Sequence, residues 1–310
     1  MKFNYDILDD TEKIGYALLS LYNEYGYCKY RMGKFEEYDF YSRNKDFLLS
    51  DNVITFTDIN SRLMALKPDV TLSIIKNSRD EPDALKKLSY MENVYRVPRG
   101  GDSFREIMQV GLECMGDVDT GCLSEVLMLA AKSLELTETG YAVEISHLDI
   151  LSFFIGGISD RPETRQALYK CAGEKNLHEI GEICAANGIP EEHVKPLGVL
   201  LGLSGGSAAA LKELEQLAAR YDIGTKVALL KELVSDVTGK CGPDSIKIDF
   251  SIVSDMNYYN GIVFRGFLNG IPSSVLSGGQ YDRLMEKMDR KSRAVGFAVY
   301  IDLMQYIFGR

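Results

Sequence analysis

The stretch that decides the fold is residues 91–116, MENVYRVPRGGDSFREIMQVGLECMG. Two strand-like runs in this stretch flank a loop rich in Gly, Pro and Arg, which spans residues 98–103. Glycine and proline supply the backbone conformations that tight connections need, so two runs joined in this way predict a β-hairpin. We therefore expect an antiparallel pair of strands here.

Further elements are predicted on both sides of the hairpin. Residues 10–25 carry apolar side chains at helical spacing and predict an amphipathic helix. Residues 53–58 read as a strand, with residues 64–66 as its return strand. On the C-terminal side, residues 123–136 predict another helix.

The character of the sequence changes between about residues 162 and 240, where helical periods with capping residues follow one another. The chain then returns to strand-like runs at 246–250 and 261–267 and finishes with an apolar segment, 294–308. This order predicts an α+β fold, with a mostly antiparallel sheet flanked by helices and a helical insertion. The expected parts are a core first part, 1–158, the insertion, 159–241, and a core second part, 242–310.

Composition and charge exclude several classes of protein. The formal net charge is -10, and no segment carries the dense Lys and Arg stripe that a polyanion-binding face requires, which weighs against tRNA as a partner. The N-terminus lacks a signal-peptide pattern and the longest apolar run, residues 126–131, cannot cross a bilayer, so we expect a cytoplasmic protein without a membrane anchor. The histidines and cysteines show no metal-ligand spacing, and we expect neither a metal site nor a cofactor.

Four stretches, in this order along the chain, carry a family resemblance. They are DINSRLMALKPDVT at 58–71, the stretch 95–113 that includes FREIMQVGLE, SDMNYYNGIVF at 254–264, and SGGQYDRL at 277–284 followed by VGFAVYIDL at 295–303. Together they resemble the histidyl-tRNA synthetases and their paralogues, which have the class II synthetase fold. The resemblance covers nearly the whole chain.

The resemblance implies a pocket for a histidine-like ligand. Asp69 and Thr71 occupy the positions that present an acid and a threonine to the amino group of the substrate. Arg96 matches the arginine that grips a phosphate, and Gln109 and Glu113 match the residues that line the amino-acid pocket. The remaining matches are three tyrosines, Tyr258, Tyr259 and Tyr281.

Two cations that an adenylating member of the family uses are missing. Ser254 stands where a catalytic arginine is expected, and Leu303 replaces the arginine that stacks on ATP. Pro98 also replaces a glutamate of the ATP loop. Activation of a carboxylate by ATP brings two anions together, and loss of one preorganised donor typically costs on the order of a hundredfold to a thousandfold in rate. We therefore expect no catalytic residues and no useful adenylation.

The chain resembles one branch of this family, the regulatory subunits of short-form ATP phosphoribosyltransferase. Like them, it keeps the residues of the amino-acid pocket, lacks the arginines that adenylation needs, and is expected to have no anticodon-binding domain after Arg310. The resemblance implies the short catalytic subunit as a partner and self-association as a dimer within a hetero-octamer. It also implies histidine as an effector and no role for tRNA. The implied function is to support the catalytic subunit and its histidine feedback in the first step of histidine biosynthesis.

Two other functions stay open. One is a divergent histidine-activating ligase that acts on an acceptor other than tRNA, which histidine-dependent pyrophosphate exchange would reveal. The other is a free-standing histidine sensor that docks on an unrelated protein through the helical insertion, which a pull-down would reveal.

Several site residues also have structural interpretations. The acidic and amide residues of the first two stretches fit solvated or strand-end positions as well. If Tyr258 and Tyr259 lie in one strand, their side chains alternate and only one of them faces a ligand. Gly278-Gly279 fits an ordinary turn. For His147 we expect a hydrogen-bonded structural role.

Overall fold

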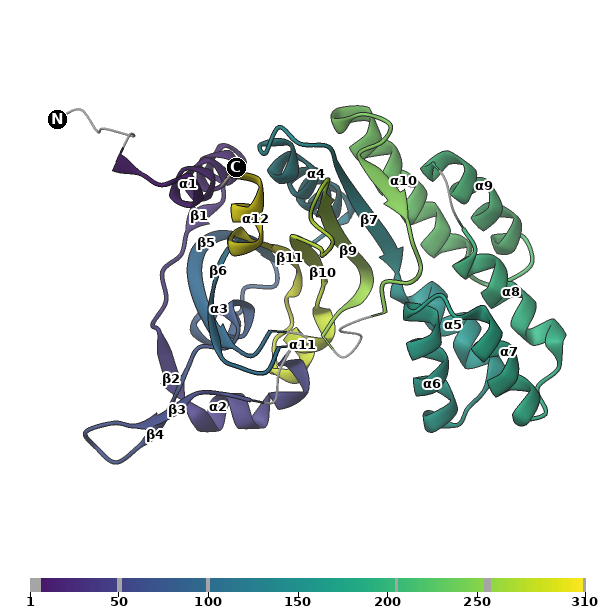
Figure 1. The fold of residues 1–310 in the computed structure, drawn as a ribbon, viewed down its shortest axis with the longest axis horizontal. Coiled ribbons are helices and arrows are strands. Elements are labelled where there is room, and N and C mark those ends of the chain that lie inside the picture. Colours follow the sequence, from purple (N-terminus) through teal and green to yellow (C-terminus); the bar gives the residue numbers. More distant parts are fainter. Residues whose placement is uncertain (1–6, 49–51, 99–100, 204–205, 254–257, 309–310) are drawn as a thin grey trace.

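The structure is a computed structural model that describes residues 7–48, 52–98, 101–203, 206–253 and 258–308. Within these ranges the largest element is an eight-stranded sheet (Figure 1). Its strands, in spatial order, are β1 (Cys28–Lys29), β5 (Leu85–Arg96), β6 (Arg105–Gly116), β11 (Arg293–Tyr300), β10 (Leu276–Gln280), β9 (Asn260–Leu268), β7 (Tyr141–His147) and β8 (Ile246–Ile248). The two outermost pairs, β1 with β5 and β7 with β8, are parallel, and all other neighbours are antiparallel. The predicted α+β fold on a mostly antiparallel sheet is confirmed.

The predicted hairpin forms one half of this sheet. Strands β5 and β6 pair antiparallel along their whole length, from Leu85 opposite Gly116 to Arg96 opposite Arg105. The hairpin is therefore confirmed, although its first strand begins earlier than the sequence suggested. On its other side β6 pairs with β11, so the first and last parts of the chain share one sheet, as expected.

The two faces of the sheet carry different side chains, because successive side chains of a strand point to opposite sides. In β6, Val110, Leu112 and Cys114 are fully buried in the main hydrophobic cluster, whereas Gln109 and Glu113 point to the other face. Three helices pack on the apolar face: α1 (Asp10–Glu24), α4 (Thr120–Glu135) and α12 (Ile301–Phe308). The opposite face carries both a second, smaller hydrophobic cluster and these polar side chains.

The chain between β7 and β8 is helical, as the sequence predicts. Its helices are α5 (Leu148–Ile158), α6 (Pro162–Gly173), α7 (Leu177–Ala186), α8 (Glu191–Leu201), α9 (Ser207–Ala218) and α10 (Gly224–Cys241). In Figure 1, α6–α9 lie at the right-hand end of the molecule, and α10 packs along α4. Leu197 and Leu214 of this block belong to the same hydrophobic cluster as the covered face of the sheet.

The helical block is thus joined to the core by shared packing and not only by its two connections. The expected boundaries at residues 158 and 241 coincide with the ends of α5 and α10, and the division into core and insertion stays a prediction. Among the helices of the described ranges, none combines the length and apolar character that a membrane span requires.

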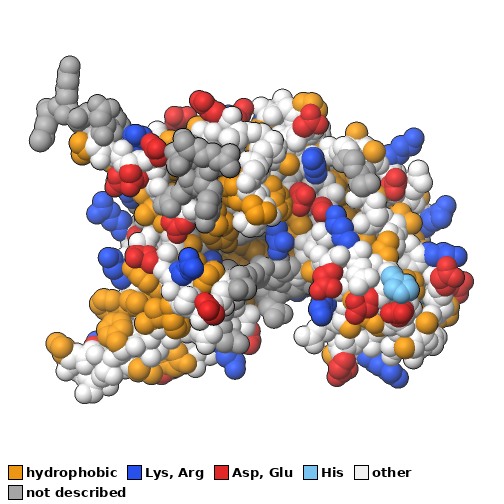
Figure 2. Space-filling model, in the orientation of Figure 1, with side chains coloured by type: hydrophobic (Ala, Val, Ile, Leu, Met, Phe, Trp, Pro, Cys, Tyr) orange, Lys and Arg blue, Asp and Glu red, His pale blue; other side chains and the backbone are white. Residues whose placement is uncertain are grey.

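A second, three-stranded sheet projects from the molecule, and we call it the arm. Its strands, in spatial order, are β2 (Phe35–Glu37), β4 (Leu63–Leu66) and β3 (Thr55–Thr57), which confirms the predicted strand and its return strand. Helix α2 (Tyr38–Arg43) and a 3-10 turn, Lys45–Phe47, follow β2. Large apolar side chains are exposed on the arm, and Figure 2 shows them gathered at its lower left. They are Phe35, Phe56, Ile59 and Leu63, of which Ile59 is fully exposed.

Gly278 and Gly279 lie inside β10, so the interpretation of this pair as an ordinary turn is wrong. A Cβ on Gly278 would lie 2.4 Å from the carbonyl oxygen of Gly296 and 2.4 Å from the Cβ of Phe297. A Cβ on Gly279 would lie 2.7 Å from the carbonyl oxygen of Ile262. The adjacent strands and their side chains leave no room for a methyl group at either position.

The substitution Gly278→Ala should lower the free energy of unfolding by about 1 to 3 kcal/mol, because the added methyl group must displace backbone. Urea unfolding followed by circular dichroism measures the effect. Gly181→Ala is the matched control, since a Cβ at this exposed position of α7 meets nothing within 4 Å. That change should be stabilising by up to about 1 kcal/mol because alanine is the better helix former. Equal effects of the two changes would contradict the close-approach argument.

Candidate functional site

A pocket lies on the polar face of the sheet, over β5, β6, β11 and β10. It encloses about 490 Å³ of empty space, part of which is open to solvent. All eight predicted site residues line it: Asp69, Thr71, Arg96, Gln109, Glu113, Tyr258, Tyr259 and Tyr281. The fold therefore brings the predicted set together in one place.

The floor of the pocket is hollow because neighbouring strands carry glycine or alanine there. Gly111 of β6 lies opposite Ala298 of β11, and Gly296 of β11 lies opposite Glu113 of β6. A Cβ on Gly296 would lie only 1.8 Å from Oε2 of Glu113, and one on Gly111 would lie 2.4 Å from the hydroxyl oxygen of Tyr90. These glycines leave the space that the carboxyl group and the tyrosine ring occupy.

Glu113 is a buried acid in the pocket, with 2% of its surface exposed. The hydroxyl of Thr71 donates a hydrogen bond of 2.7 Å to Oε1, and the hydroxyl of Tyr281 donates one of 2.5 Å to Oε2. Burial raises the pKa of Glu113 to about 8, against the two hydroxyl donors, which lower it, and together with the charge of Asp69, which raises it further. A cation or hydrogen-bond donor that enters the pocket would favour the charged form of this group.

Helix α3 (Val70–Asn77) positions Asp69 and Thr71. Asp69 is the N-cap of this helix, and its side chain accepts a hydrogen bond of 2.8 Å from the backbone N–H of Leu72. Burial raises the pKa of Asp69, against the helix N–H groups and the guanidinium of Arg96, which lower it. This helix was not predicted from the sequence. An aspartate directly before an apolar helical run is the sequence signal that was missed.

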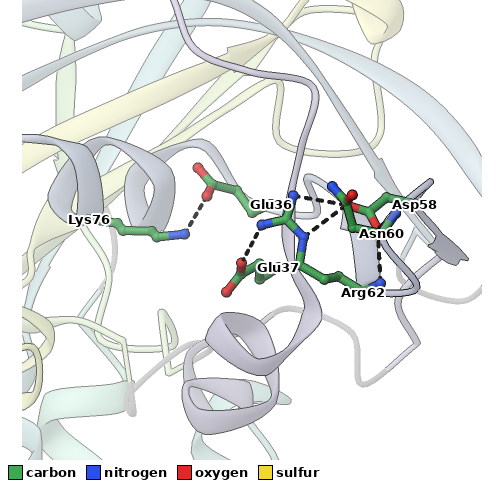
Figure 3. A network of polar contacts seen from close by, with 6 residues as sticks. All are labelled: Glu36, Glu37, Asp58, Asn60, Arg62 and Lys76. Atoms are coloured by element: carbon green, nitrogen blue, oxygen red, sulfur yellow. Dashed lines mark hydrogen bonds and ion pairs between the residues drawn. The ribbon is translucent and has the colours of Figure 1, made fainter.

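A polar network braces α3 against the arm (Figure 3). Lys76, near the end of α3, donates a hydrogen bond to Glu36 of β2. Within the arm, Arg62 forms ion pairs with Glu37 at 3.2 Å and with Asp58 at 2.8 Å. The helix that presents two pocket residues is therefore connected at its other end to the exposed arm.

Tyr258 and Tyr259 both line the pocket, so the expectation that only one of them faces a ligand is wrong. The two rings pack edge to face, with centroids 4.8 Å apart, and both residues precede β9 instead of lying within it. Gly261 at the start of β9 has a φ of 62°, and the register of β9 against β10 shifts between Gly279 and Gln280. This irregularity lies within β9, after the tyrosines. Both rings can line the pocket because neither residue is part of the strand, in which side chains alternate.

Arg96 and Gln109 complete the predicted set. Arg96 ends β5, is 6% exposed, and lies close enough to Asp69 for its charge to lower the pKa of that carboxyl group. Gln109 is 5% exposed and lies opposite Tyr300 of β11. A guanidinium in a buried pocket is suited to a carboxylate or phosphate group of a ligand.

Six further residues line the pocket without having been predicted as site residues. They are Tyr90, Ser277, Gly296, Phe297, Ala298 and Tyr300. None of them is charged, and only the pairing of β5, β6, β11 and β10 places them beside the predicted ones. These residues line the pocket because of the register in which the strands pair, and the sequence pattern does not specify that register.

The position of the second missing arginine is occupied by a partly buried leucine. Leu303 of α12 packs against the main hydrophobic cluster. The carboxylate of its neighbour Asp302 accepts a hydrogen bond of 2.9 Å from the backbone N–H of Met108 in β6. Ser254, the position of the first missing arginine, lies outside the described residues.

His147 is buried at the end of β7, with 4% of its surface exposed, and burial lowers its pKa to about 4. Its Nδ1 has no hydrogen-bond partner among the described residues, so this atom does not supply the hydrogen bond expected for His147. In the parts of the chain that the structure describes, no three His, Cys, Asp or Glu side chains are grouped so that they could hold a metal ion.

The raised pKa of Glu113 predicts how stability depends on pH. The folded protein binds this proton more tightly than the unfolded chain, so the contribution of Glu113 to stability is complete below a pH of about 4.5 and is lost as the pH rises to about 8. In urea titrations at several pH values, the difference in free energy of unfolding between the wild type and Glu113→Gln should fall across this window. The exposed change Glu213→Gln corrects for the loss of one carboxylate. A difference that rises with pH would mean that Glu113 is ionised in the folded protein.

Comparison with known proteins places the chain in a family. The model of the histidyl-tRNA synthetase family matches residues 8–304. A curated relative, the ATP phosphoribosyltransferase regulatory subunit of Oceanobacillus iheyensis, is 26% identical over 281 residues, which cover 90% of this chain and 69% of the relative.

Solved structures agree in fold. An ATP phosphoribosyltransferase regulatory subunit/histidyl-tRNA synthetase from Bacillus halodurans superposes with a TM-score of 0.84 at 25% identity, covering 99% of this chain and 83% of that one. A chain of the ATP phosphoribosyl transferase complex from Thermotoga maritima superposes with a TM-score of 0.74 at 19% identity, covering 94% of this chain and 97% of that one. The pocket, the sheet and these matches agree, and this chain belongs to the histidyl-tRNA synthetase family.

Proposed function

We propose that this protein is the regulatory subunit of a short-form ATP phosphoribosyltransferase, which binds histidine and performs no adenylation of its own. The observation that carries the proposal is the pocket, in which acidic, guanidinium and phenolic groups converge from the predicted positions. The names of its relatives, ATP phosphoribosyltransferase regulatory subunits, support the same branch of the family.

The chemistry of the pocket suits a free amino acid with an imidazole ring. The carboxylate of Asp69 suits an ammonium group, and the guanidinium of Arg96 suits a carboxylate. Glu113, held by the hydroxyls of Thr71 and Tyr281, can accept a hydrogen bond from an imidazole N–H. A buried carboxyl group that is close to its ionisation point can adjust its charge to a ring that also titrates near neutral pH.

The proposed lack of adenylation rests on electrostatics. An enzyme that joins a carboxylate to ATP needs fixed positive charge beside both anions. The side chain at position 303 is a partly buried leucine that packs against the hydrophobic cluster, so it supplies neither charge nor a pocket contact.

The proposed partners are the short catalytic subunit and a second copy of this chain. The structure from Thermotoga maritima is that of an ATP phosphoribosyl transferase complex, and a chain of similar fold supports an assembly of the same kind here. The exposed apolar side chains of the arm support self-association, because contiguous apolar surface of this kind marks interaction sites. The formal net charge of -10 argues against tRNA as a partner.

Reconstitution with a short catalytic subunit tests the proposal directly. Mixed with that subunit, the protein should form a stable complex in size-exclusion chromatography. The complex should catalyse phosphoribosyl transfer faster than the catalytic subunit alone, and histidine should lower this rate. The protein alone should show no histidine-dependent exchange of pyrophosphate into ATP. Rapid exchange would instead favour the histidine-activating ligase, which the buried guanidinium of Arg96 could serve. Complex formation with an unrelated protein, without any effect on transfer, would favour the free-standing sensor.

Histidine binding tests the pocket assignment. Glu113→Gln and Tyr281→Phe should each weaken binding by about 1 to 3 kcal/mol, because the first replaces one acceptor oxygen with a donor and the second removes a hydroxyl donor from the buried carboxyl group. Isothermal titration calorimetry measures the change. Tyr16→Phe on the exposed surface of α1 is the control for loss of a phenol hydroxyl, and its affinity should equal that of the wild type. Unchanged affinity in both pocket variants would remove the assignment.

A further inference from the structure

Tyr300 and Ser277 form a hydrogen bond at one end of the pocket floor, which we call the bridge. The proposed function does not explain this bond. Tyr300 is the last residue of β11 and Ser277 lies in β10, and their hydroxyl oxygens are 2.7 Å apart. Both residues line the pocket, and both are only half-buried. The hydrogen bond joins two adjacent strands at one end of the pocket floor.

The position of Tyr300 follows from the alternation of side chains along β11. Gly296, Ala298 and Tyr300 are two residues apart and therefore point to the same face of the sheet. The first two carry at most a methyl group, so Tyr300 is the first full-sized side chain along this strand on the pocket side. Glu113 lies opposite Gly296 and Gln109 lies opposite Tyr300. At about 3.4 Å per residue, the floor between these two levels is about 14 Å long.

Beyond the bridge the same face of the sheet continues as a strip of charged side chains. Arg265 of β9 lies opposite Ser277, Glu144 of β7 lies opposite Arg265, and Lys247 of β8 lies opposite Glu144. Ser277, which lines the pocket, is the residue at which the pocket meets this strip.

We propose that Tyr300 is a specificity-determining residue that limits the pocket to a free amino acid and excludes one whose carboxyl group carries a large substituent. The inference rests on the proposed function, with the imidazole ring beside Glu113 and the carboxyl group toward Arg96 and Gln109. In this orientation a substituent on the carboxyl group extends toward Tyr300 and must displace its ring. Tyr300 would exclude such a ligand by its size and not by charge, so this effect is independent of the missing arginines.

The experiment compares histidinamide with its N-benzyl derivative, which differ only in the size of the group on the carboxyl carbon. Neither ligand carries a carboxylate charge, so their ratio of affinities reports steric fit. By calorimetry the wild type should bind histidinamide more tightly by about tenfold or more, since a fixed ring excludes the larger ligand. In Tyr300→Ala the preference should fall to about threefold or less, because the ring that excludes the benzyl group is gone.

Two further variants separate the ring from its hydrogen bond. Tyr300→Phe and Ser277→Ala each keep the ring and remove the same hydrogen bond, so both should retain most of the preference, with a ratio between those of the wild type and Tyr300→Ala. A wild type that binds both amides equally, or an unchanged ratio in Tyr300→Ala, would overturn the proposal. The wild-type ratio needs no variant, so a folding defect cannot mask the result. If histidine and histidinamide both fail to bind the wild type, the proposed function fails and the role of Tyr300 fails with it. If both bind and the ratio is flat, only the role of Tyr300 is lost.

Discussion

The site depends on one buried carboxyl group and the way it is held. Glu113 comes from the centre of the large sheet, Thr71 from the first turn of α3, and Tyr281 from the junction of β10 and α11 (Asp282–Lys287). Burial of this acid without partners would be costly, and the two hydroxyl donors offset part of that cost. The same contacts tie three separate segments of the chain to a single point. The geometry of the pocket is therefore also a constraint on how the core assembles.

Around this group, the two faces of the sheet have different roles. One face is covered by α1, α4 and α12 and supplies the hydrophobic cluster that stabilises the domain. The other face carries a second, smaller hydrophobic cluster, which includes Val94 of β5 and Leu72 of α3, and the charged and hydroxyl groups of the pocket lie beside it. Glycines at Gly111 and Gly296 complete this division, since their missing side chains create the hollow that the polar groups surround.

The same fold supports either an adenylating enzyme or a binding subunit, and the difference lies in a few side chains. In this chain a leucine that packs against the hydrophobic cluster stands where the resemblance expects an arginine, while the amino-acid end of the pocket keeps its acids and phenols. Binding needs complementarity to the ligand alone, whereas catalysis also needs fixed charge where the transition state develops it. A pocket can therefore lose its chemistry without losing its ligand.

Most of the element types followed from the sequence, because they depend on local patterns. The hairpin of β5 and β6, the helical block and the return to strands each have a period or a turn signal of their own. The set of charged and phenolic site residues could also be found, since their types and order are visible in the chain. The prediction from the strand period was wrong for Tyr258 and Tyr259, which lie before β9 and not within it. The N-cap that Asp69 provides for α3 was not predicted.

The sequence by itself thus determined the class of fold, the family and the polar groups of the site. Only the tertiary structure decided that Tyr90, Ser277 and Tyr300 also line the pocket, that Gly278 and Gly279 lie within a strand, and that Glu113 has a raised pKa. The reason is physical. Strand register, close approach and desolvation arise from segments far apart in the chain, and no local pattern of residues records them.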